Sequence, residues 1–256
     1  MCTVVLLRRP GHRWPLLLGA NRDEQVDRSW RAPARHWPDR PEVVAGFDEE
    51  ANGSWLGIND AGVVAAVLNR RHSLGPAAGK RSRGELVLEA LDHTDAASAA
   101  NALGALDAKA YRPFNLIIAD NRDAWWLKGL GDGGDGTVGV TEVDEGISLF
   151  TAWDMNDTEN SDRTAHYLPR FEAAPPPEPD QDDWGVWEAL LASRKRGGAG
   201  GDPNGAMEVV TSWGFATVSS SLIALPAPSV AATAPRWRFA KVWPRREPYR
   251  EVLLRR

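Results

Sequence analysis

Hydrophobic and polar positions along the first 70 residues form short apolar runs separated by turn signals. The runs at 3–8 and 16–20 are β-compatible, and the Arg-Pro-Gly-His-Arg-Trp-Pro segment between them favours a turn. A second pair of runs, at 55–58 and 63–68, is joined by Asn-Asp-Ala-Gly. The pattern predicts two hairpins. Residues 28–53 between them are rich in Arg, Pro, Asp and Gly, so we expect a long surface excursion there.

The later pattern mixes helices and strands. Ser82 and Glu85 have capping-box spacing before a helical apolar face, and the alanine-rich segment 95–109 predicts a second helix. Two further helices are expected, one ending at Pro169 and one containing Trp184 with a cationic last turn in Ser-Arg-Lys-Arg-Gly-Gly. Further strands are expected at 113–120, 124–130, 146–152, 215–225 and 236–243. This order predicts an α+β layered fold with mostly antiparallel strands, in a single domain over 1–256.

Composition and charge exclude several classes of protein. The chain has 256 residues and a net charge of -5, and its Lys and Arg residues are scattered, which argues against nucleic-acid binding. Its apolar runs are far shorter than the roughly 20 residues of a membrane helix. Arginines and prolines interrupt the first apolar pieces, so a signal peptide would lack its apolar centre. We therefore expect a cytoplasmic protein without a membrane span.

The single cysteine, Cys2, needs an explanation of its own. One thiol cannot form an internal disulfide or a multi-thiolate metal site. Removal of the initiator methionine would leave an α-amine and a thiol on the same carbon. The amine titrates at about pH 8 and the thiol at about 8.5, so the amine can take the thiol proton and later return it. Cys2 is therefore a candidate nucleophile; the alternative is a small buried residue beside the first strand.

Two polar stretches complement such a nucleophile. In the predicted first hairpin, the far end of the second strand lies beside the start of the first, which brings Asn21, Arg22 and Asp23 near Cys2. A carboxylate there can hold the α-ammonium, and an arginine favours thiolate over thiol. Asn69 closes a buried apolar strand, where its amide can donate to the oxyanion of a tetrahedral intermediate. The competing interpretations are a solvated turn for the charge run and a turn residue at Asn69.

Five stretches in residues 1–120 carry a family resemblance. MCTVV, LGANRDE, NGSWLGINDAGVVAAVLNRR, SRGELV and PFNLIIAD occur in the order seen in the NRDE family, also called the transport and Golgi organisation protein 2 family. That family is similar to N-terminal-nucleophile (Ntn) hydrolases, and GINDAGVVAAVLN also resembles the stretch with the oxyanion asparagine in bile salt hydrolases and penicillin V acylases. The resemblance implies a four-layer αββα sandwich. It matches Cys2 to the nucleophile, Asp23 to the carboxylate that holds the amine and Asn69 to the oxyanion donor, and it aligns Asn21 more securely than Arg22.

The second half departs from the family pattern. The acylases carry a second active-site asparagine on a later strand, where NRDE proteins often read Leu-Ser-Asn, yet this chain has Ala152 at the counterpart. Near the C-terminus family members often read Thr-Arg-Thr or Thr-Arg-Ser, and Val218 occupies the usually cationic position. We therefore expect one oxyanion donor fewer than in the acylases and one cation fewer than in many members of the family.

The sequence leaves two functions open. The first is a cysteine Ntn amidohydrolase that acts on a non-peptide C–N bond of a small acylated substrate and requires no cofactor. The alternative, implied by the resemblance, is a non-catalytic haem or lipid/acyl-CoA binding and trafficking protein, which a pocket lined by some of the twelve tryptophans would suit. Any haem would be held non-covalently, because no Cys-x-x-Cys-His motif is present. Surface or packing roles are predicted for the five scattered histidines, which are His12, His36, His72, His93 and His166.

Overall fold

The computed structural model describes residues 2–197, 205–230 and 233–254. The chain divides into two compact units, one formed by Met1–Arg28 and Glu145–Glu251 and the other by Ser29–Asp144 and Val252–Arg256. In the described residues each unit contains one antiparallel sheet and two α-helices. The predicted α+β class with antiparallel sheets is therefore confirmed, while the prediction of a single domain stays a prediction.

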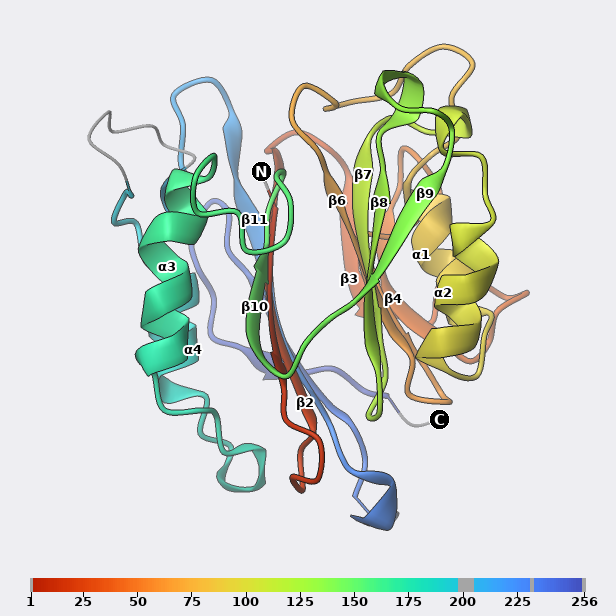
Figure 1. Cartoon of the computed structure of the whole chain (residues 1–256). Helices are drawn as coiled ribbons and strands as arrows, with labels where there is room; N and C mark the ends of the chain where they lie inside the picture. Colours follow the sequence, from red (N-terminus) through yellow and green to blue (C-terminus); the bar gives the residue numbers. More distant parts are fainter. Residues whose placement is uncertain (1, 198–204, 231–232, 255–256) are drawn as a thin grey trace. The chain divides into compact units, whose positions relative to one another are not determined.

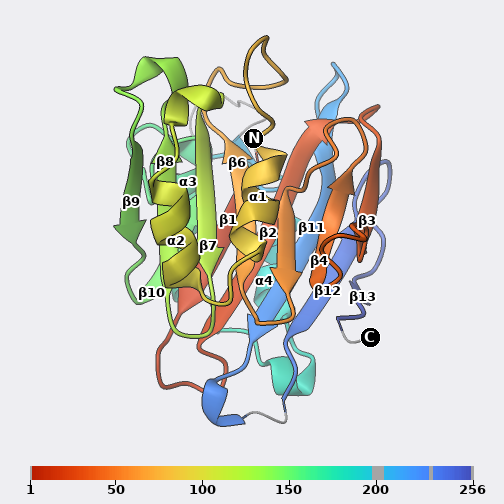
Figure 2. The same ribbon diagram turned by 90° about the vertical axis from the view of Figure 1, so that its right-hand side faces the viewer.

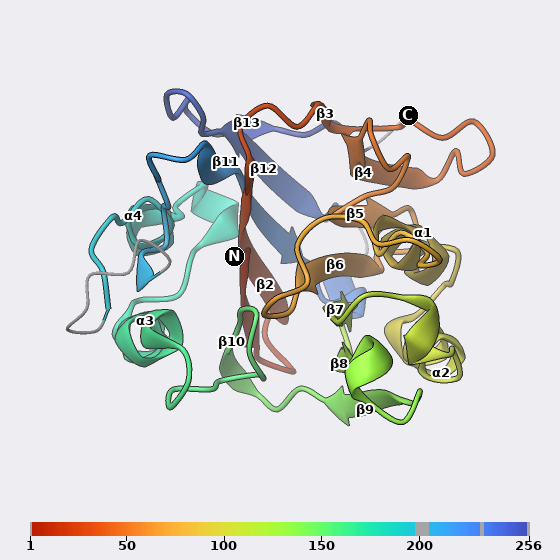
Figure 3. The same cartoon turned by 90° about the horizontal axis from the view of Figure 1, so that it is seen from above.

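The first unit is built around the hairpin at the start of the chain. Its six-stranded sheet has the order β10-β1-β2-β11-β12-β13. Helices α3 and α4 lie over one face of this sheet (Figure 1; Figure 3 gives the view from above). Its elements are β1 (Thr3–Arg8), β2 (Leu16–Gln25), β10 (Gly146–Phe150), α3 (Asp162–Ala173), α4 (Gly185–Leu191), β11 (Phe215–Leu225), β12 (Arg236–Lys241) and β13 (Arg250–Glu251).

The second unit contains a seven-stranded sheet with the strands in chain order, from β3 to β9. Helices α1 and α2 cover one of its faces (Figure 2). Their apolar sides pack on the central strands, in a core that includes Leu86, Val87, Leu116 and Ile118. Its elements are β3 (Trp30–Ala34), β4 (Val43–Asp48), β5 (Leu56–Asn59), β6 (Val64–Asn69), α1 (Gly84–Leu91), α2 (Ala96–Gly104), β7 (Phe114–Ala119), β8 (Ala124–Gly129) and β9 (Val138–Glu142).

Both predicted hairpins are present, but the expected surface excursion at 28–53 is wrong in part. Strand β4 lies within it and pairs with β5, and its Val43, Val44 and Ala45 are buried, with Val43 and Ala45 packed in the helix-covered core. Strand β3 pairs with β4 on the outer side. The charged and Pro-rich composition of the segment thus hid one short buried strand.

Three helix details differ from the expectations. The capping box at Ser82 and Glu85 does not form, because the Ser82 hydroxyl accepts from the N–H of Gly84 and Glu85 pairs with Arg81. Helix α3 continues past Pro169 to Ala173, which keeps Phe171 packed against Trp187 in the core. Helix α4 ends at Leu191, before the basic stretch. That stretch therefore lies outside the last turn, and its final glycine, at 198, lies outside the described residues.

Among the described residues, no helix combines the length and apolar character that spanning a bilayer would require.

Candidate active site

The polar run at 21–25 lies inside β2 and not in a turn after it. Thr3 pairs with Asn21 across β1 and β2, and on the other side Asn21 pairs with Ser220 and Asp23 with Thr217 of β11. A register shift between Thr217 and Ser219 accommodates these pairs. The strand can continue through Asn21 and Asp23 because buried partners on the neighbouring elements satisfy these two side chains.

Alternation along β2 separates the polar residues into two sets. Asn21 bonds to the end of α4 and Asp23 to α3, so both side chains point toward the helices. Arg22 therefore points to the opposite face, where it lies 3.8 Å from Glu24. Thr3 also bonds to α3, so alternation directs the preceding residue, Cys2, to the same face as Arg22.

Asp23 is held by two side chains from different elements. Thr217 Oγ1 donates a hydrogen bond to Oδ1 at 2.5 Å, and Arg163 Nη2 of α3 lies 3.2 Å from Oδ2. The Asp23 and Arg163 side chains are 0% and 1% exposed. Arg163 Nη1 also donates to Thr3 Oγ1, so one guanidinium joins α3 to both strands of the hairpin. A charged pair buried this deeply needs such hydrogen bonds to offset its loss of hydration.

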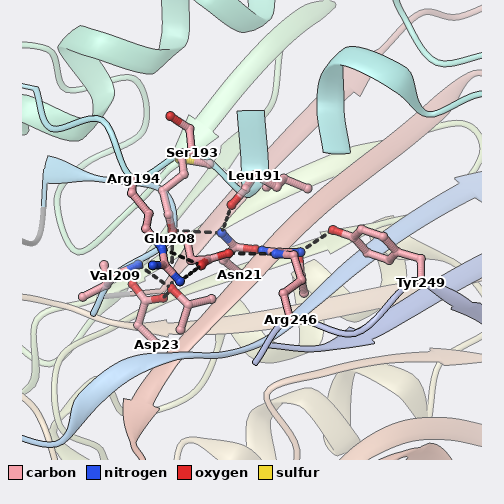
Figure 4. A network of polar contacts seen from close by, with 12 residues as sticks. Asn21, Asp23, Leu191, Ser193, Arg194, Glu208, Val209, Arg246 and Tyr249 are labelled. Carbon is pink, nitrogen blue, oxygen red and sulfur yellow. Dashed lines mark hydrogen bonds and ion pairs between the residues drawn. The ribbon is translucent and has the colours of Figure 1, made fainter. Parts of the chain in front are cut away.

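The side chain of Asn21 links β2 to neighbouring segments that come much later in the chain (Figure 4). Its Nδ2 donates to the carbonyl oxygens of Leu191 and Met207 at 2.8 and 2.9 Å. Its Oδ1 accepts from Ser220 Oγ at 2.6 Å, and Ser220 shares a further hydrogen bond of 2.6 Å with Tyr249. Both polar atoms of the amide side chain are thus engaged in protein contacts, and the place of Asn21 among the catalytic residues stays a prediction.

A second buried carboxylate lies in the same network. Glu208 accepts from Arg194 on one oxygen, at 2.6 and 2.8 Å, and from Arg246 on the other, at 2.7 Å (Figure 4). Its side chain is 4% exposed. Glu208 directly follows Met207, whose carbonyl binds Asn21, so this pair of arginines fixes the segment on which Asn21 depends.

Cys2 is half-buried and immediately precedes β1, and its thiol donates to the main-chain oxygen of Asp23 at 3.6 Å. Burial raises the pKa of the Cys2 thiol above its ordinary value, and the Asp23 carboxylate raises it further. The thiol is therefore the form present at neutral pH, and a base is needed to make it a nucleophile.

The remaining predicted residues lie as follows. Arg22 is buried in β2, between Asn21 and Asp23. Asn69 belongs to the other unit, where it ends β6 and pairs with Phe114 of β7, and it is half-buried. Its role as oxyanion donor stays a prediction. Ala152 follows β10 and Val218 lies at the register shift of β11, and both are buried apolar residues without a donor in the side chain.

The sequence does not predict two partners of Asp23. Arg163 lies 140 positions from Asp23 and Thr217 lies 194 positions away, so no local motif joins them. The sequence holds one weak indication of Arg163. This charged residue directly precedes Thr164, which lies with Tyr167 and Phe171 on the side of the helix that faces the core. Within the described ranges, no group of three or more His, Cys, Asp and Glu residues could hold a metal ion.

Comparison with known sequences decides the family. The profile of the Transport and Golgi organisation 2 family matches residues 1–145. The chain belongs to this family. The Transport and Golgi organization protein 2 homolog of Bos taurus is 40% identical over 111 residues, and that of Homo sapiens 37%. Each match covers 41% of this chain and 38% of the relative, so the chain matches well under half the length of these family members.

Solved structures share the fold of this family member at low sequence identity. The Caenorhabditis elegans ortholog of N-acylethanolamine-hydrolyzing acid amidase is 12% identical, with a TM-score of 0.56 over 90% of this chain and 96% of its own. Penicillin V acylase from Agrobacterium tumefaciens is 14% identical, with a TM-score of 0.54 over 94% and 83%. A variant of conjugated bile acid hydrolase from Clostridium perfringens is 12% identical, with a TM-score of 0.58 over 98% and 92%. The predicted Ntn-hydrolase fold is thereby confirmed.

Proposed function

We propose that the protein is a cysteine Ntn hydrolase that cleaves a non-peptide C–N bond in a small acylated substrate. The observation that carries the proposal is the contact of the Cys2 thiol with the main chain of Asp23, whose carboxylate is fully buried and held from two sides. A buried ion pair contributes little net stability. Its position beside the single thiol of the chain therefore fits a role in chemistry better than a role in folding.

The proposed reaction begins once Met1 is removed and Cys2 carries a free α-amine. The amine takes the thiol proton, and sulfur attacks the substrate carbonyl carbon to form a C–S bond and an oxyanion. The family resemblance of the sequence predicts that Asn69 donates to that oxyanion. The protonated amine then gives its proton to the leaving nitrogen as the C–N bond breaks, which leaves a thioester.

The second half of the reaction restores the enzyme. Water attacks the thioester carbon and passes a proton to the α-amine. The C–S bond breaks, the amine returns that proton to sulfur, and the carboxylic acid is released. We assign to Asp23 the holding of the α-amine through both halves, and to Arg22 the support of the thiolate from the same face of the sheet.

We propose the substrate class from the solved structures that share the fold. They are named as an N-acylethanolamine-hydrolyzing amidase, a penicillin V acylase and a conjugated bile acid hydrolase. These names share an acyl group or a conjugate on a small molecule, and we extend only that common class to this chain. Apolar side chains at positions 152 and 218 set it apart, and we expect slower turnover than with a full set of polar groups.

The test is hydrolysis of a panel of N-acylated amines by three forms of the protein. The unaltered chain should turn over at least one member, whereas Cys2→Ala should lose at least about a thousandfold in rate. An alanine inserted between Met1 and Cys2 keeps the thiol but moves the terminal amine, and it should lose activity to a similar degree. Equal turnover by Cys2→Ala and the unaltered chain would falsify the proposal.

The haem or lipid/acyl-CoA alternative stays a prediction. Titration of the protein with haem, followed by the haem absorption band, separates it from hydrolysis. A spectral change at micromolar protein that persists in Cys2→Ala would favour the binding function, because that function does not depend on the thiol.

A further inference from the structure

Arg163 contacts both residues that determine where Cys2 lies. Its Nη1 donates to the hydroxyl of Thr3, the residue after Cys2. Its Nη2 lies 3.2 Å from Oδ2 of Asp23. The main-chain oxygen of Asp23 accepts a hydrogen bond from the Cys2 thiol. The guanidinium is suited to this task because its planar fork presents several donors at fixed angles, whereas a lysine presents one point of charge.

Arg163 is itself held firmly. It lies in the first turn of α3, next to Thr164, whose N–H and hydroxyl both bond to the N-cap residue Ser161 at 3.1 and 2.8 Å. On the same helix Phe171 packs edge-on against Trp187 of α4. The guanidinium is therefore attached to a helix that is anchored in the core, and its charge has a fixed position relative to the hairpin.

Within the described part of this unit, charged residues of two elements lie next to Cys2. Strand β2 contributes Arg22, Asp23 and Glu24, and α3 contributes Arg163. The facing residues of β11 are uncharged, and Thr217 is the one that bonds to Asp23. The next carboxylate of the network, Glu208, is already paired with two arginines. Asp23 and Arg163 together have no net charge.

We propose that Arg163 is a positioning residue whose fixed positive charge makes the Cys2 amine and thiol give up their protons more readily. This inference rests on the proposed function in one respect, which is that the α-amine of Cys2 is the base. An α-amine beside a lone carboxylate is stabilised as ammonium, but beside a neutral pair it gains much less, so more of it is present as free amine at neutral pH. Loss of the cation removes this effect from amine and thiol alike, so both titrate at higher pH.

The test follows the alkylation of Cys2 by iodoacetamide as a function of pH. The chain has one cysteine, so the gain of mass reports this residue alone. In Arg163→Gln the midpoint of the rate profile should move to higher pH, and the rate at neutral pH should fall about tenfold, which corresponds to one pH unit. Arg163→Lys keeps the charge and should keep the midpoint. Arg170→Gln removes an exposed arginine from the same helix and should leave the profile unchanged.

The Arg163→Gln variant leaves the buried carboxylate of Asp23 without its cation, which can prevent folding. A second comparison therefore uses chains that lack this carboxylate. Asp23→Asn is compared with the double variant Asp23→Asn/Arg163→Gln, so that only the cation differs between two chains that both lack the carboxylate. The double variant should have the higher midpoint and react about tenfold more slowly at neutral pH. Equal midpoints in this comparison, or an equal shift caused by Arg170→Gln, would overturn the inference.

Failure of this inference can be told apart from failure of the proposed function. Alkylation needs no substrate and no turnover, so the midpoints report on Arg163 even if every N-acylated amine is left intact. If instead Cys2→Ala loses hydrolysis but the midpoints of the two comparisons coincide, the hydrolase stands and Arg163 is a structural residue only.

Discussion

Thr217 and Asp23 face each other across β11 and β2, and the hydroxyl of Thr217 donates to the carboxylate at 2.5 Å. The same hydroxyl oxygen accepts the N–H of Val209 at 2.8 Å, so it connects the carboxylate to the segment before β11. The orientation of Asp23 therefore depends on β11 as much as on the hairpin that carries Cys2.

Replacement of Thr217 by valine keeps the shape of the side chain and removes both hydrogen bonds. We expect the free energy of unfolding to fall by about 2 kcal/mol, because a buried carboxylate oxygen and a buried N–H each lose a partner. Urea unfolding measures this change. Thr141→Val, at an exposed position on β9, is the matched control and should change stability by less than about 0.5 kcal/mol. Equal stability of the two variants would contradict the assigned contacts.

Asn21→Ala tests whether the amide supports the site instead of taking part in chemistry. The change leaves the carbonyls of Leu191 and Met207 and the hydroxyl of Ser220 without the amide, so we expect a loss of about 3 kcal/mol or more. Thermal or urea unfolding measures it, with Asn101→Ala at an exposed position of α2 as the control. A fully stable Asn21→Ala chain that has lost hydrolysis would assign the amide to catalysis.

Tyr111, which is buried, and Tyr249, which is half-buried, should respond in opposite ways to loss of the hydroxyl. Among the described residues the Tyr111 hydroxyl has no hydrogen-bond partner, whereas that of Tyr249 bonds to Ser220. Tyr111→Phe should therefore leave stability at neutral pH unchanged or raise it. Tyr249→Phe should lower it by about 1 kcal/mol. Urea unfolding of the two variants at pH 7 makes the comparison, and a larger loss in Tyr111→Phe would show that the assigned bonding is wrong.

The pH dependence of Tyr111 has a definite sign. Burial, with a smaller contribution from Glu89, raises the pKa of Tyr111 from 10.0 to about 12. Because the pKa is higher in the folded chain, its contribution to stability is complete below pH 10 and is lost as the pH rises from 10 to 12. The unaltered chain should lose stability over this window more steeply than Tyr111→Phe. Parallel curves for the two chains would mean that the phenol titrates normally.

Local sequence patterns predicted the first hairpin and its consequence for Cys2. The apolar runs at 3–8 and 16–20, with a Pro-Gly turn between them, were sufficient to place residues 21–23 beside the start of the chain. The sequence did not show that β2 continues to Gln25, because polar residues end most half-exposed strands. Here the helices and β11 supply partners for them.

The environment of Asp23 could not be predicted, because it depends on contacts far along the chain. Arg163 reaches Asp23 from a helix and Thr217 from a strand near the other end, and neither belongs to a motif that includes Asp23. The hidden strand β4 shows the same limit, since its burial follows from pairing with β5 within a segment whose composition is typical of loops. Short-range periodicity thus predicts most of the helices and strands, whereas the partners in the polar network depend on packing between distant parts of the chain.

Acid quenching during turnover, followed by mass analysis of the tryptic peptide that ends at Arg8, shows whether Cys2 is the nucleophile. The peptide should begin at Cys2 and carry the substrate acyl group as a thioester, and the Cys2→Ala peptide should carry none. Hydrolysis with Met1 still attached to the peptide, or with no acyl group on sulfur at any time during turnover, would show that Cys2 is not the nucleophile.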